Sequence, residues 1–361
     1  MDKIAFFIPS FNGGGAQKVI VNLANAMCKK NYQVDLLVVN NTGPFKTNVN
    51  SKISIVDLSA KRLITSLIPL IKYLNSEKPS ILITAMTHVN LVAIIAKMLY
   101  RSNCKIIVTE HSNTKNNLQS LSLPNIIVFK SLIRYLYPKA DKIVAVSDGV
   151  AKSLSVDFQL ANSKIQTIYN PIVSDDLIIQ SKKTVNHKWL NEKKIPVFLS
   201  VGRLSPEKDY PTLIRAFDKV RMIIPSKLII LGEGASRAEL SDLIIALNLE
   251  KDVDLYGFCE NPYAFMRSCD VFVLTSLWEG FGNVLAEALV CNTKVISTNC
   301  ESGPSEILEN GKWGTLVHVS DVNALAEAMI SNIHKRKIKT EIRANDFTIE
   351  KSVNSYIQLF G

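Results

Sequence analysis

The sequence predicts an α/β protein made of two domains, each with a parallel sheet that helices cover on both faces. Its 361 residues are too many for one ordinary hydrophobic core, so two domains are the expected arrangement. Short β-rich apolar runs alternate with longer helical patterns from one end of the chain to the other, as in βαβ units. The alternation weakens at residues 171–195, which are largely polar and basic, and then starts again. This interruption predicts a linker between two doubly wound domains.

Five strands are predicted in each half of the chain. The apolar runs of the first half lie at residues 4–8, 34–39, 81–85, 105–109 and 142–147. Those of the second half lie at residues 197–202, 227–234, 253–258, 271–276 and 294–299. Helical patterns separate them, for example at residues 16–30, where apolar side chains recur at helical spacing. We therefore expect a first domain at 1–170, a second at 196–345, and a C-terminal helix at 346–361 that packs back on the first domain.

The net charge of +10 belongs to the first half of the chain. Residues 1–190 hold 23 Lys and Arg against 10 Asp and Glu, a balance of +13, whereas residues 191–361 hold 19 against 22, a balance of −3. The first half therefore favours an anionic partner, either nucleic acid or an acidic membrane surface. The most apolar long segment, 81–99, is interrupted by polar residues, so we expect no membrane span. The six cysteines have no spacing suited to zinc.

The first loop, PSFNGGGAQK at 9–18, follows a strand and opens a helix. A dinucleotide-binding loop would need a third glycine where Lys18 stands, and no acidic residue ends the second strand, so a dehydrogenase is disfavoured. Gly14 and Gly15 allow a ligand phosphate or sugar to approach the helix N-terminus. A tight turn without a ligand explains these glycines equally well.

The corresponding loop of the second domain, VGRLSPEK at 201–208, is positively charged. Arg203 offers a planar fork for phosphate oxygens and Lys208 a point charge, so the two can neutralise a diphosphate without a metal. The alternative is a solvated surface pair. Gly232, in the weaker motif GEG at 232–234, permits close approach of a nucleotide.

The stretch SLWEGFGNVLAEAL at 276–289 places Glu279 and Glu287 around a glycine turn after an apolar strand. A carboxylate accepts two hydrogen bonds, which suits the vicinal diol of a ribose or hexose. Amides at the start of the following helix, in residues 282–284, suit sugar hydroxyls or phosphate. Either glutamate alone is common at such a position, but together with Arg203 and Lys208 they predict a sugar-nucleotide pocket.

These motifs, in this order, resemble the retaining glycosyltransferases of family 4, which have the GT-B fold of two Rossmann-like domains facing across a cleft. The resemblance covers essentially the whole chain. It implies that Glu287 holds the nucleotide ribose, that Glu279 holds the transferred sugar, and that Arg203 and Lys208 bind the diphosphate. The other donor-binding residues that it implies are Gly14, Gly15, Gly232, Tyr256, Gly257, Phe258, Phe281, Gly282, Asn283 and Val284.

The segment TEHSN at 109–113 also resembles the family and places His111 toward the donor sugar. A neutral histidine there can accept a hydroxyl proton or donate to an ether oxygen. The resemblance implies a front-face mechanism in which the leaving diphosphate helps to deprotonate the acceptor, with neither a covalent nucleophile nor a metal or other cofactor. A rival fold that depends on a metal would need an Asp-x-Asp motif directly after a strand. The Asp-x-Asp at 252–254 instead enters a predicted strand, so we expect it to be structural.

Two basic, apolar stretches account for the charge of the first half, 61–78 and 123–142. Buried helices with solvated basic edges would explain them, but amphipathic basic helices also bind anionic lipid headgroups. Lys130, Arg134 and Lys139 are the expected membrane-facing cations. No nucleic-acid motif appears, so nucleic acid is the disfavoured partner.

We expect a cytoplasmic enzyme, peripheral on the inner face of the cell membrane, that moves a hexose or N-acetylhexosamine from a UDP-sugar with retention. The resemblance is to enzymes that act on polyprenyl-diphosphate-linked saccharides in bacterial surface polysaccharide or glycan assembly, of the lipopolysaccharide O-antigen or capsule type. A soluble acceptor, or a non-catalytic sugar-nucleotide-binding protein, is the alternative.

Overall fold

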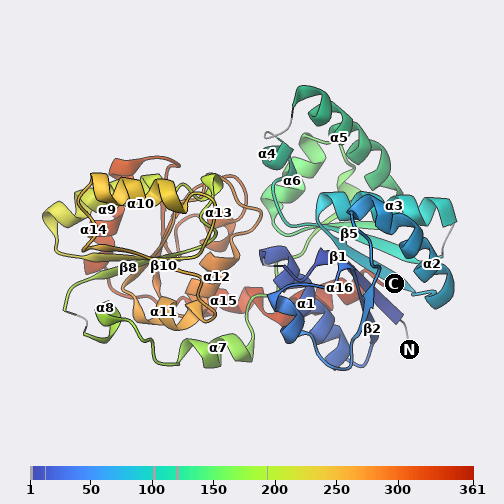
Figure 1. Ribbon diagram of the computed structural model, residues 1–361, viewed down its shortest axis with the longest axis horizontal. Coiled ribbons are helices and arrows are strands. Elements are labelled where there is room, and N and C mark those ends of the chain that lie inside the picture. The colour runs from blue at the N-terminus through green and yellow to red at the C-terminus, as the bar shows by residue number, and fades with distance from the viewer. Residues whose placement is uncertain (1–2, 13, 101–102, 119–121, 193) are drawn as a thin grey trace. The chain divides into compact units, whose positions relative to one another are not determined.

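The chain folds into two compact units, which Figure 1 shows. The computed structural model describes residues 3–12, 14–100, 103–118, 122–192 and 194–361. Unit 1 contains residues 1–171 and the C-terminal residues 349–361, and unit 2 contains residues 172–348. Each has its own parallel sheet, as the alternation of apolar runs and helical patterns predicts.

Unit 1 is built on a seven-stranded sheet with the order β3-β2-β1-β4-β5-β6-β7. Its strands are β1 (Lys3–Ser10), β2 (Gln33–Asn40), β3 (Ser54–Asp57), β4 (Ile81–Ala85), β5 (Lys105–Glu110), β6 (Lys142–Ala145) and β7 (Ile165–Thr167). All neighbouring pairs are parallel. The strand order reverses between β1 and β4, which makes the carboxyl ends of these strands the expected ligand position.

The central strands of unit 1 are apolar on both sides because helices cover both faces of the sheet. Ile4, Phe6 and Ile8 of β1 belong to a core shared with α1 (Gly15–Lys29) and α16 (Ile349–Gln358). The other helices are α2 (Leu67–Glu77), α3 (Thr87–Tyr100), α4 (Thr114–Leu118), α5 (Leu123–Leu136) and α6 (Asp148–Val156).

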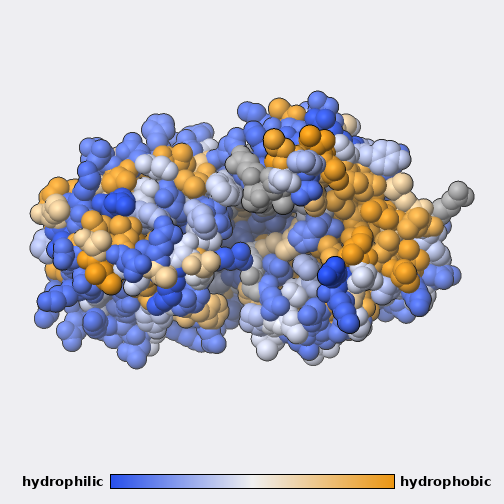
Figure 2. Space-filling view, turned by 45° about the horizontal axis from the view of Figure 1, so that its top comes forward, coloured by the Kyte–Doolittle hydropathy of each residue, from blue (hydrophilic) through white to orange (hydrophobic). Residues whose placement is uncertain are grey.

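Helix α5 differs from the others because it buries little of its apolar surface. Only Ile133 and Leu136 are buried among its described side chains. Leu123, Ile127 and Tyr135 are each at least 65% exposed. Figure 2 shows a broad apolar area on the surface of this unit.

Unit 2 is built on a six-stranded parallel sheet with the order β10-β9-β8-β11-β12-β13. Its strands are β8 (Val197–Val201), β9 (Lys227–Leu231), β10 (Val253–Gly257), β11 (Val271–Leu274), β12 (Lys294–Thr298) and β13 (Thr315–Val317). Helices α9 (Tyr210–Ile223), α10 (Arg237–Ala246) and α14 (Val322–His334) share a core with the sheet. The remaining helices are α7 (Asp175–Ser181), α8 (Lys188–Asn191), α11 (Pro262–Ser268), α12 (Asn283–Val290), α13 (Pro304–Ile307) and α15 (Glu341–Ala344).

The expected linker at 171–195 is wrong, because most of these residues fold as part of unit 2. Helix α7 packs on α11, and its Leu177 is buried. The side chain of Asn261 also donates to the carbonyl oxygen of Gln180 at 2.9 Å. The sequence of this segment contains few apolar residues because only a few of its side chains are buried.

The C-terminal helix α16 belongs to unit 1 and packs on α1. Val353 and Tyr356 enter the core of that unit, and Ser352 Oγ donates to the carbonyl oxygen of Tyr169 at 2.7 Å. The three strands that were not predicted, β3, β7 and β13, are three or four residues long. Runs this short leave no distinct apolar pattern.

Candidate active site

Two loops of unit 2 meet at the carboxyl ends of β8 and β11, where the strand order of the sheet reverses. One loop, 202–209, carries Arg203 and Lys208, and the other, 275–282, carries Glu279. They meet because β8 and β11 pair directly, although more than sixty residues separate them in the chain. Ligands of doubly wound sheets bind at this kind of position.

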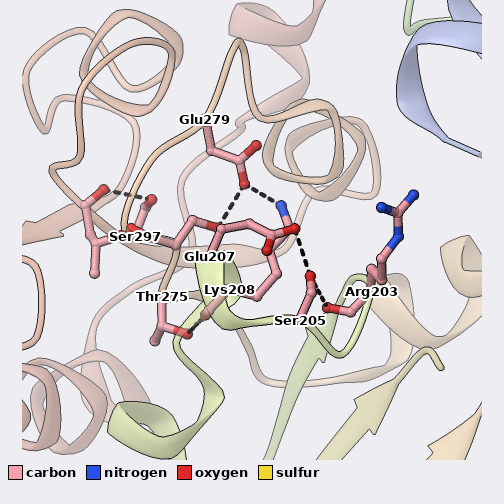
Figure 3. Close-up of polar contacts among 9 residues, drawn as sticks. Arg203, Ser205, Glu207, Lys208, Thr275, Glu279 and Ser297 are labelled. Atoms are coloured by element: carbon pink, nitrogen blue, oxygen red, sulfur yellow. Dashed lines mark hydrogen bonds and ion pairs between the residues drawn. The ribbon is translucent and has the colours of Figure 1, made fainter. Parts of the chain in front are cut away.

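Lys208 and Glu279 form an ion pair at the centre of the site (Figure 3), with 2.5 Å between Lys208 Nζ and Glu279 Oε1. The same carboxylate oxygen accepts from Ser276 Oγ at 2.6 Å. The side chains of Lys208 and Glu279 are only 18% and 12% exposed, so both charges are partly removed from water. Glu279 Oε2 makes no polar contact within the described part of the chain. The site therefore presents a fixed cation beside a carboxylate oxygen that can accept from a hydroxyl.

Hydrogen bonds between the loops hold this pair in place. Thr275 Oγ1 donates to the carbonyl oxygen of Lys208 at 2.8 Å, and the backbone N–H of Leu277 donates to the carbonyl oxygen of Glu207 at 2.8 Å. Thr298 Oγ1 donates to the carbonyl oxygen of Ser276 at 2.6 Å. Sequence reasoning missed Ser276 and Thr275, whose only signal is that they directly follow a buried strand.

Helix α12 begins immediately after this loop. Gly282 is its N-cap, with φ of +96°, a conformation that favours glycine. Asn283 and Val284 are the first two residues of the helix, whose N-terminus favours anions and other acceptors. The side chain of Phe281 is buried and packs on Phe347, with 5.3 Å between ring centroids, so only its backbone is available to a ligand.

Glu287 lies one turn into α12 and does not join the Lys208–Glu279 pair. It is 5% exposed, and one of its oxygens lies 3.5 Å from Tyr263 Oη of α11. The sequence spacing therefore puts the two glutamates on successive elements of one loop-helix unit, each with its own surroundings. Two separate carboxylates can serve two different groups of one ligand.

The guanidinium of Arg203 points away from the Lys208–Glu279 pair (Figure 3) and is exposed. Its loop packs closely on the one that contains Gly232. A Cβ at Gly232 would lie 1.9 Å from the carbonyl oxygen of Gly202, so only glycine fits. The amide of Gly232 donates to the carbonyl oxygen of Gly257 at 2.8 Å.

The aromatic residues at the end of β10 have different surroundings. Tyr256 is 42% exposed and packs against Phe265, with 5.2 Å between ring centroids. Phe258 is 70% exposed. The exposed ring of Phe258 is available to stack on a base, whereas one side of Tyr256 is already covered.

In unit 1, His111 follows β5, and its Nε2 lies 2.9 Å from Thr109 Oγ1. Burial lowers the pKa of His111 to about 4, so the ring is neutral at pH 7. Gly14 caps α1, and Gly15 is its first residue, after the carboxyl end of β1. Gly13 lies outside the described residues.

The neighbouring residue, Glu110, is fully buried and anchors the end of β5. Thr87 and Thr114 donate to its Oε2 at 3.0 and 3.1 Å, and Asn90 donates to its Oε1 at 3.0 Å. Tyr137 also donates to Oε1. Burial raises the pKa of this carboxyl group. The sequence analysis gave no role to Glu110, because nothing in the pattern shows that these side chains converge.

The Asp-x-Asp of residues 252–254 has partners that explain it. Asp252 pairs with Lys227 at 2.7 Å, and Asp254 lies 3.1 Å from Nε2 of His187. No group of three or more His, Cys, Asp and Glu side chains among the described residues is arranged to hold a metal ion.

Comparisons with known proteins assign the chain to a family. Residues 13–176 match the model of "Glycosyltransferase Family 4", and residues 181–347 match that of "Glycosyl transferases group 1". A curated Campylobacter jejuni protein, N-acetylgalactosamine-N,N'-diacetylbacillosaminyl-diphospho-undecaprenol 4-alpha-N-acetylgalactosaminyltransferase, is 32% identical over 96% of both chains. The chain is a family 4 glycosyltransferase.

Two further matches also span nearly all of this glycosyltransferase. A second C. jejuni protein, GalNAc-alpha-(1->4)-GalNAc-alpha-(1->3)-diNAcBac-PP-undecaprenol alpha-1,4-N-acetyl-D-galactosaminyltransferase, is 25% identical over 100% of this chain and 99% of its own. The crystal structure of Anabaena Alr3699/HepE in complex with UDP-glucose has a TM-score of 0.82 at 20% identity and covers 99% of both chains. The expected family and the GT-B fold are confirmed. No helix in the described part of this glycosyltransferase is long and apolar enough to cross a membrane.

Proposed function

We propose that this glycosyltransferase moves a hexose or N-acetylhexosamine from a UDP-sugar to a polyprenyl-diphosphate-linked saccharide, with retention at the anomeric carbon. The observation that carries the proposal is the Lys208–Glu279–Ser276 cluster at the switch point of unit 2. It combines a cation for a leaving diphosphate with a carboxylate for sugar hydroxyls. Partial burial strengthens both interactions.

In the proposed reaction, an oxygen of the acceptor bonds to the anomeric carbon while the bond from that carbon to the diphosphate breaks. The acceptor proton passes to the departing diphosphate. Lys208 and Arg203 stabilise the charge that develops on this group, and Glu279 orients the sugar. Glu287 accepts from the ribose hydroxyls, and the start of α12 donates to the sugar or phosphate.

The names of the relatives support the acceptor class. Both C. jejuni relatives are named as transferases that act on undecaprenol-linked saccharides. Another relative, 25% identical over 83% of this chain, is the amylovoran biosynthesis glycosyltransferase AmsD of Erwinia amylovora. We therefore place the proposed reaction in bacterial surface polysaccharide or glycan assembly, and put UDP-N-acetylgalactosamine first among the donors to test.

We further propose that unit 1 binds an anionic membrane on the cytoplasmic side through the surface of α5. Large apolar side chains are exposed along this helix, and Lys139 Nζ lies 5.7 Å from the ring centroid of Tyr135. Arg134 is exposed and Lys130 is half-buried. Apolar side chains next to cations suit the boundary between acyl chains and anionic headgroups.

The apolar surface continues beyond α5. Helix α3 contacts both α5 and α2, and it exposes Met98 and Leu99 at its C-terminal end. Ile64 and Ile68, next to Lys61 and Arg62, are more than 60% exposed. Monomeric proteins seldom expose contiguous apolar patches of this kind without a partner. We therefore propose that the broad apolar area of unit 1 in Figure 2 is the surface that faces the lipid.

The decisive experiment incubates the protein with UDP-glucose, UDP-galactose, UDP-N-acetylglucosamine or UDP-N-acetylgalactosamine and a polyprenyl-diphosphate-linked saccharide. We expect UDP release together with an acceptor that is heavier by one sugar residue in mass spectrometry. Proton NMR of the product should show an α linkage. Transfer to a soluble saccharide alone would establish the alternative acceptor class. UDP-sugar binding without any product would point to a binding protein.

We also propose that the reaction needs no metal, because Lys208 and Arg203 supply the positive charge. Activity should then persist in EDTA. Complete loss in EDTA with recovery on adding Mn²⁺ would contradict this part of the proposal.

A further inference from the structure

In unit 1, a single hydroxyl group decides which hydrogen bonds His111 can make. Thr109 Oγ1 lies 2.7 Å from the carbonyl oxygen of Thr84 and 2.9 Å from Nε2 of His111. A carbonyl oxygen can only accept, so the 2.7 Å contact must contain the hydroxyl proton of Thr109. A hydroxyl has one proton, and its oxygen can therefore only accept from the imidazole. Nε2 of His111 must carry the ring proton.

The other ring nitrogen is then an acceptor. A neutral imidazole has one N–H, and burial keeps His111 neutral at pH 7 by lowering its pKa to about 4. Nδ1 is buried and has no hydrogen-bond partner among the residues that the structure describes. A buried acceptor of this kind costs free energy until some group donates to it.

Thr109 is fully buried in β5, which pairs with β4 and β6 on its two sides. Helix α3 holds its backbone, because Asn90 Nδ2 donates to the backbone oxygen of Thr109 at 2.9 Å. Asn90 in turn accepts from Thr84 Oγ1 at 2.6 Å and donates to Glu110 at 3.0 Å. These contacts fix the backbone around Thr109, and its hydroxyl stays committed to the carbonyl oxygen of Thr84 at 2.7 Å.

We propose that Thr109 is a positioning residue that fixes His111 in the Nε2–H tautomer, so that Nδ1 accepts a hydrogen bond from a hydroxyl group of a saccharide substrate. In the Nε2–H tautomer, Nδ1 of His111 carries no proton, so it cannot donate a hydrogen bond to an ether oxygen of the substrate. The identity of the ligand rests on the proposed function, whereas the tautomer does not. The hydroxyl belongs to either the donor sugar or the acceptor sugar, and the experiment separates the two.

The tautomer is measured without any substrate, by NMR of the full-length protein labelled with ¹⁵N-histidine. Comparison with His111→Gln identifies the His111 signals among the five histidines. We expect the Nε2–H form alone in the wild type and in Thr109→Ser, and a mixture in Thr109→Val, which loses the hydroxyl but keeps the size of the side chain. A wild-type protein with mainly the Nδ1–H form would overturn the proposal, whatever reaction the protein catalyses.

Thr84→Val is the matched control. The hydroxyl of Thr84 is also fully buried, but it donates to Asn90 and does not touch His111. We expect this variant to keep the wild-type tautomer. An equal tautomer change in Thr84→Val and Thr109→Val would mean general disturbance of the strands, and the positioning role would be rejected.

Kinetics then identify the hydroxyl. With UDP-N-acetylgalactosamine and a polyprenyl-diphosphate-linked saccharide, Thr109→Val should lower kcat/KM by about 2- to 10-fold, the range of one neutral hydrogen bond, and Thr109→Ser should restore it. The difference should disappear for the one monodeoxy analogue that lacks the hydroxyl bound by Nδ1. If this analogue is a donor, the hydroxyl bound by Nδ1 belongs to the donor sugar, and if it is an acceptor, the hydroxyl belongs to the acceptor sugar. A difference that persists with every analogue would show that Nδ1 binds no hydroxyl, and would overturn the proposal. Absence of turnover with all substrates, beside an intact Nε2–H signal, would count against the proposed function instead.

Discussion

At the scale of single residues, the two cations Lys208 and Arg203 have the largest expected effects on turnover. We expect Lys208→Ala and Arg203→Ala each to lower kcat by about 10²–10³, the usual loss when a preorganised charge is removed from a developing anion. Lys208→Ala also leaves Glu279 without the cation that lies 2.5 Å away. Steady-state UDP release with a fixed lipid-linked acceptor measures the effect.

Lys312→Ala, which also removes a lysine of unit 2, is the control for these two variants. Lys312 pairs with Glu309 at 2.8 Å, but its side chain is 64% exposed, so the pair contributes little. Its turnover should stay near that of the wild type. Wild-type rates in both site variants would show that neither cation stabilises the leaving diphosphate.

His111 should also make the stability of the protein depend on pH. In the unfolded chain the His111 imidazole has a pKa of about 6.5. In the folded protein, burial lowers the pKa of the same group to about 4. Between these values the unfolded state binds more protons, so the free energy of unfolding falls as the pH is lowered from 6.5 to 4. His111→Gln should lose this part of the slope. The measurement is the urea midpoint of both proteins at pH 7 and pH 5, and parallel shifts in the two would contradict the assignment.

At the scale of elements, α16 shows how the end of the chain completes a unit that begins at the other end. Ser352, Val353 and Tyr356 are buried on one side of this helix, whereas Glu350, Lys351 and Asn354 are exposed. Tyr356 is only 2% exposed. The stability of unit 1 therefore depends on residues that lie far from the rest of this unit in sequence.

Tyr356→Ala tests this dependence. We expect a loss of about 3–5 kcal/mol in the free energy of unfolding of unit 1, as for other large aromatic side chains removed from a core. Tyr135→Ala is the control, because that ring is 65% exposed, and its cost should stay within about 0.5 kcal/mol. Urea denaturation with hydrogen exchange on β1 and β2 as the local probe measures both. Equal stability of the two variants would show that α16 is dispensable.

At the scale of the whole molecule, the excess positive charge of the first half should control where the enzyme works. Replacing Lys130, Arg134 and Lys139 by Gln should weaken binding to anionic vesicles by orders of magnitude, since each cation near such a surface contributes about 1 kcal/mol. Hydrolysis of the UDP-sugar by water, which needs no membrane, should change little. Co-sedimentation with vesicles of rising anionic lipid content and rising salt measures the binding.

The matched control replaces Lys219, Lys251 and Lys335 of unit 2 by Gln, which changes the net charge by the same amount outside unit 1. This triple variant should bind vesicles almost as the wild type does. Equal losses in the two triple variants would mean that net charge alone, and not the surface of α5, drives binding. Binding that ignores lipid charge would remove the membrane proposal.

Ten of the thirteen strands in the described part of the chain could be predicted from the sequence, because a buried parallel strand needs a continuous apolar run. The short strands β3, β7 and β13 could not, since three or four half-exposed residues form no distinct pattern. The sequence also did not predict that most of residues 171–195 fold as part of unit 2, because few of their side chains are buried and the partners of these side chains lie elsewhere in the unit.

By itself, the sequence determined which residue types stand at the carboxyl ends of the strands, because glycine turns, paired glutamates and a basic loop are local patterns. It could not determine which of these residues meet. The 71-residue separation of Lys208 and Glu279 is closed only by the pairing of β8 with β11. Likewise, the proton position on His111 depends on a threonine hydroxyl that is itself committed to the neighbouring strand. Hydrogen bonds act over about 3 Å, so only the tertiary structure decides them.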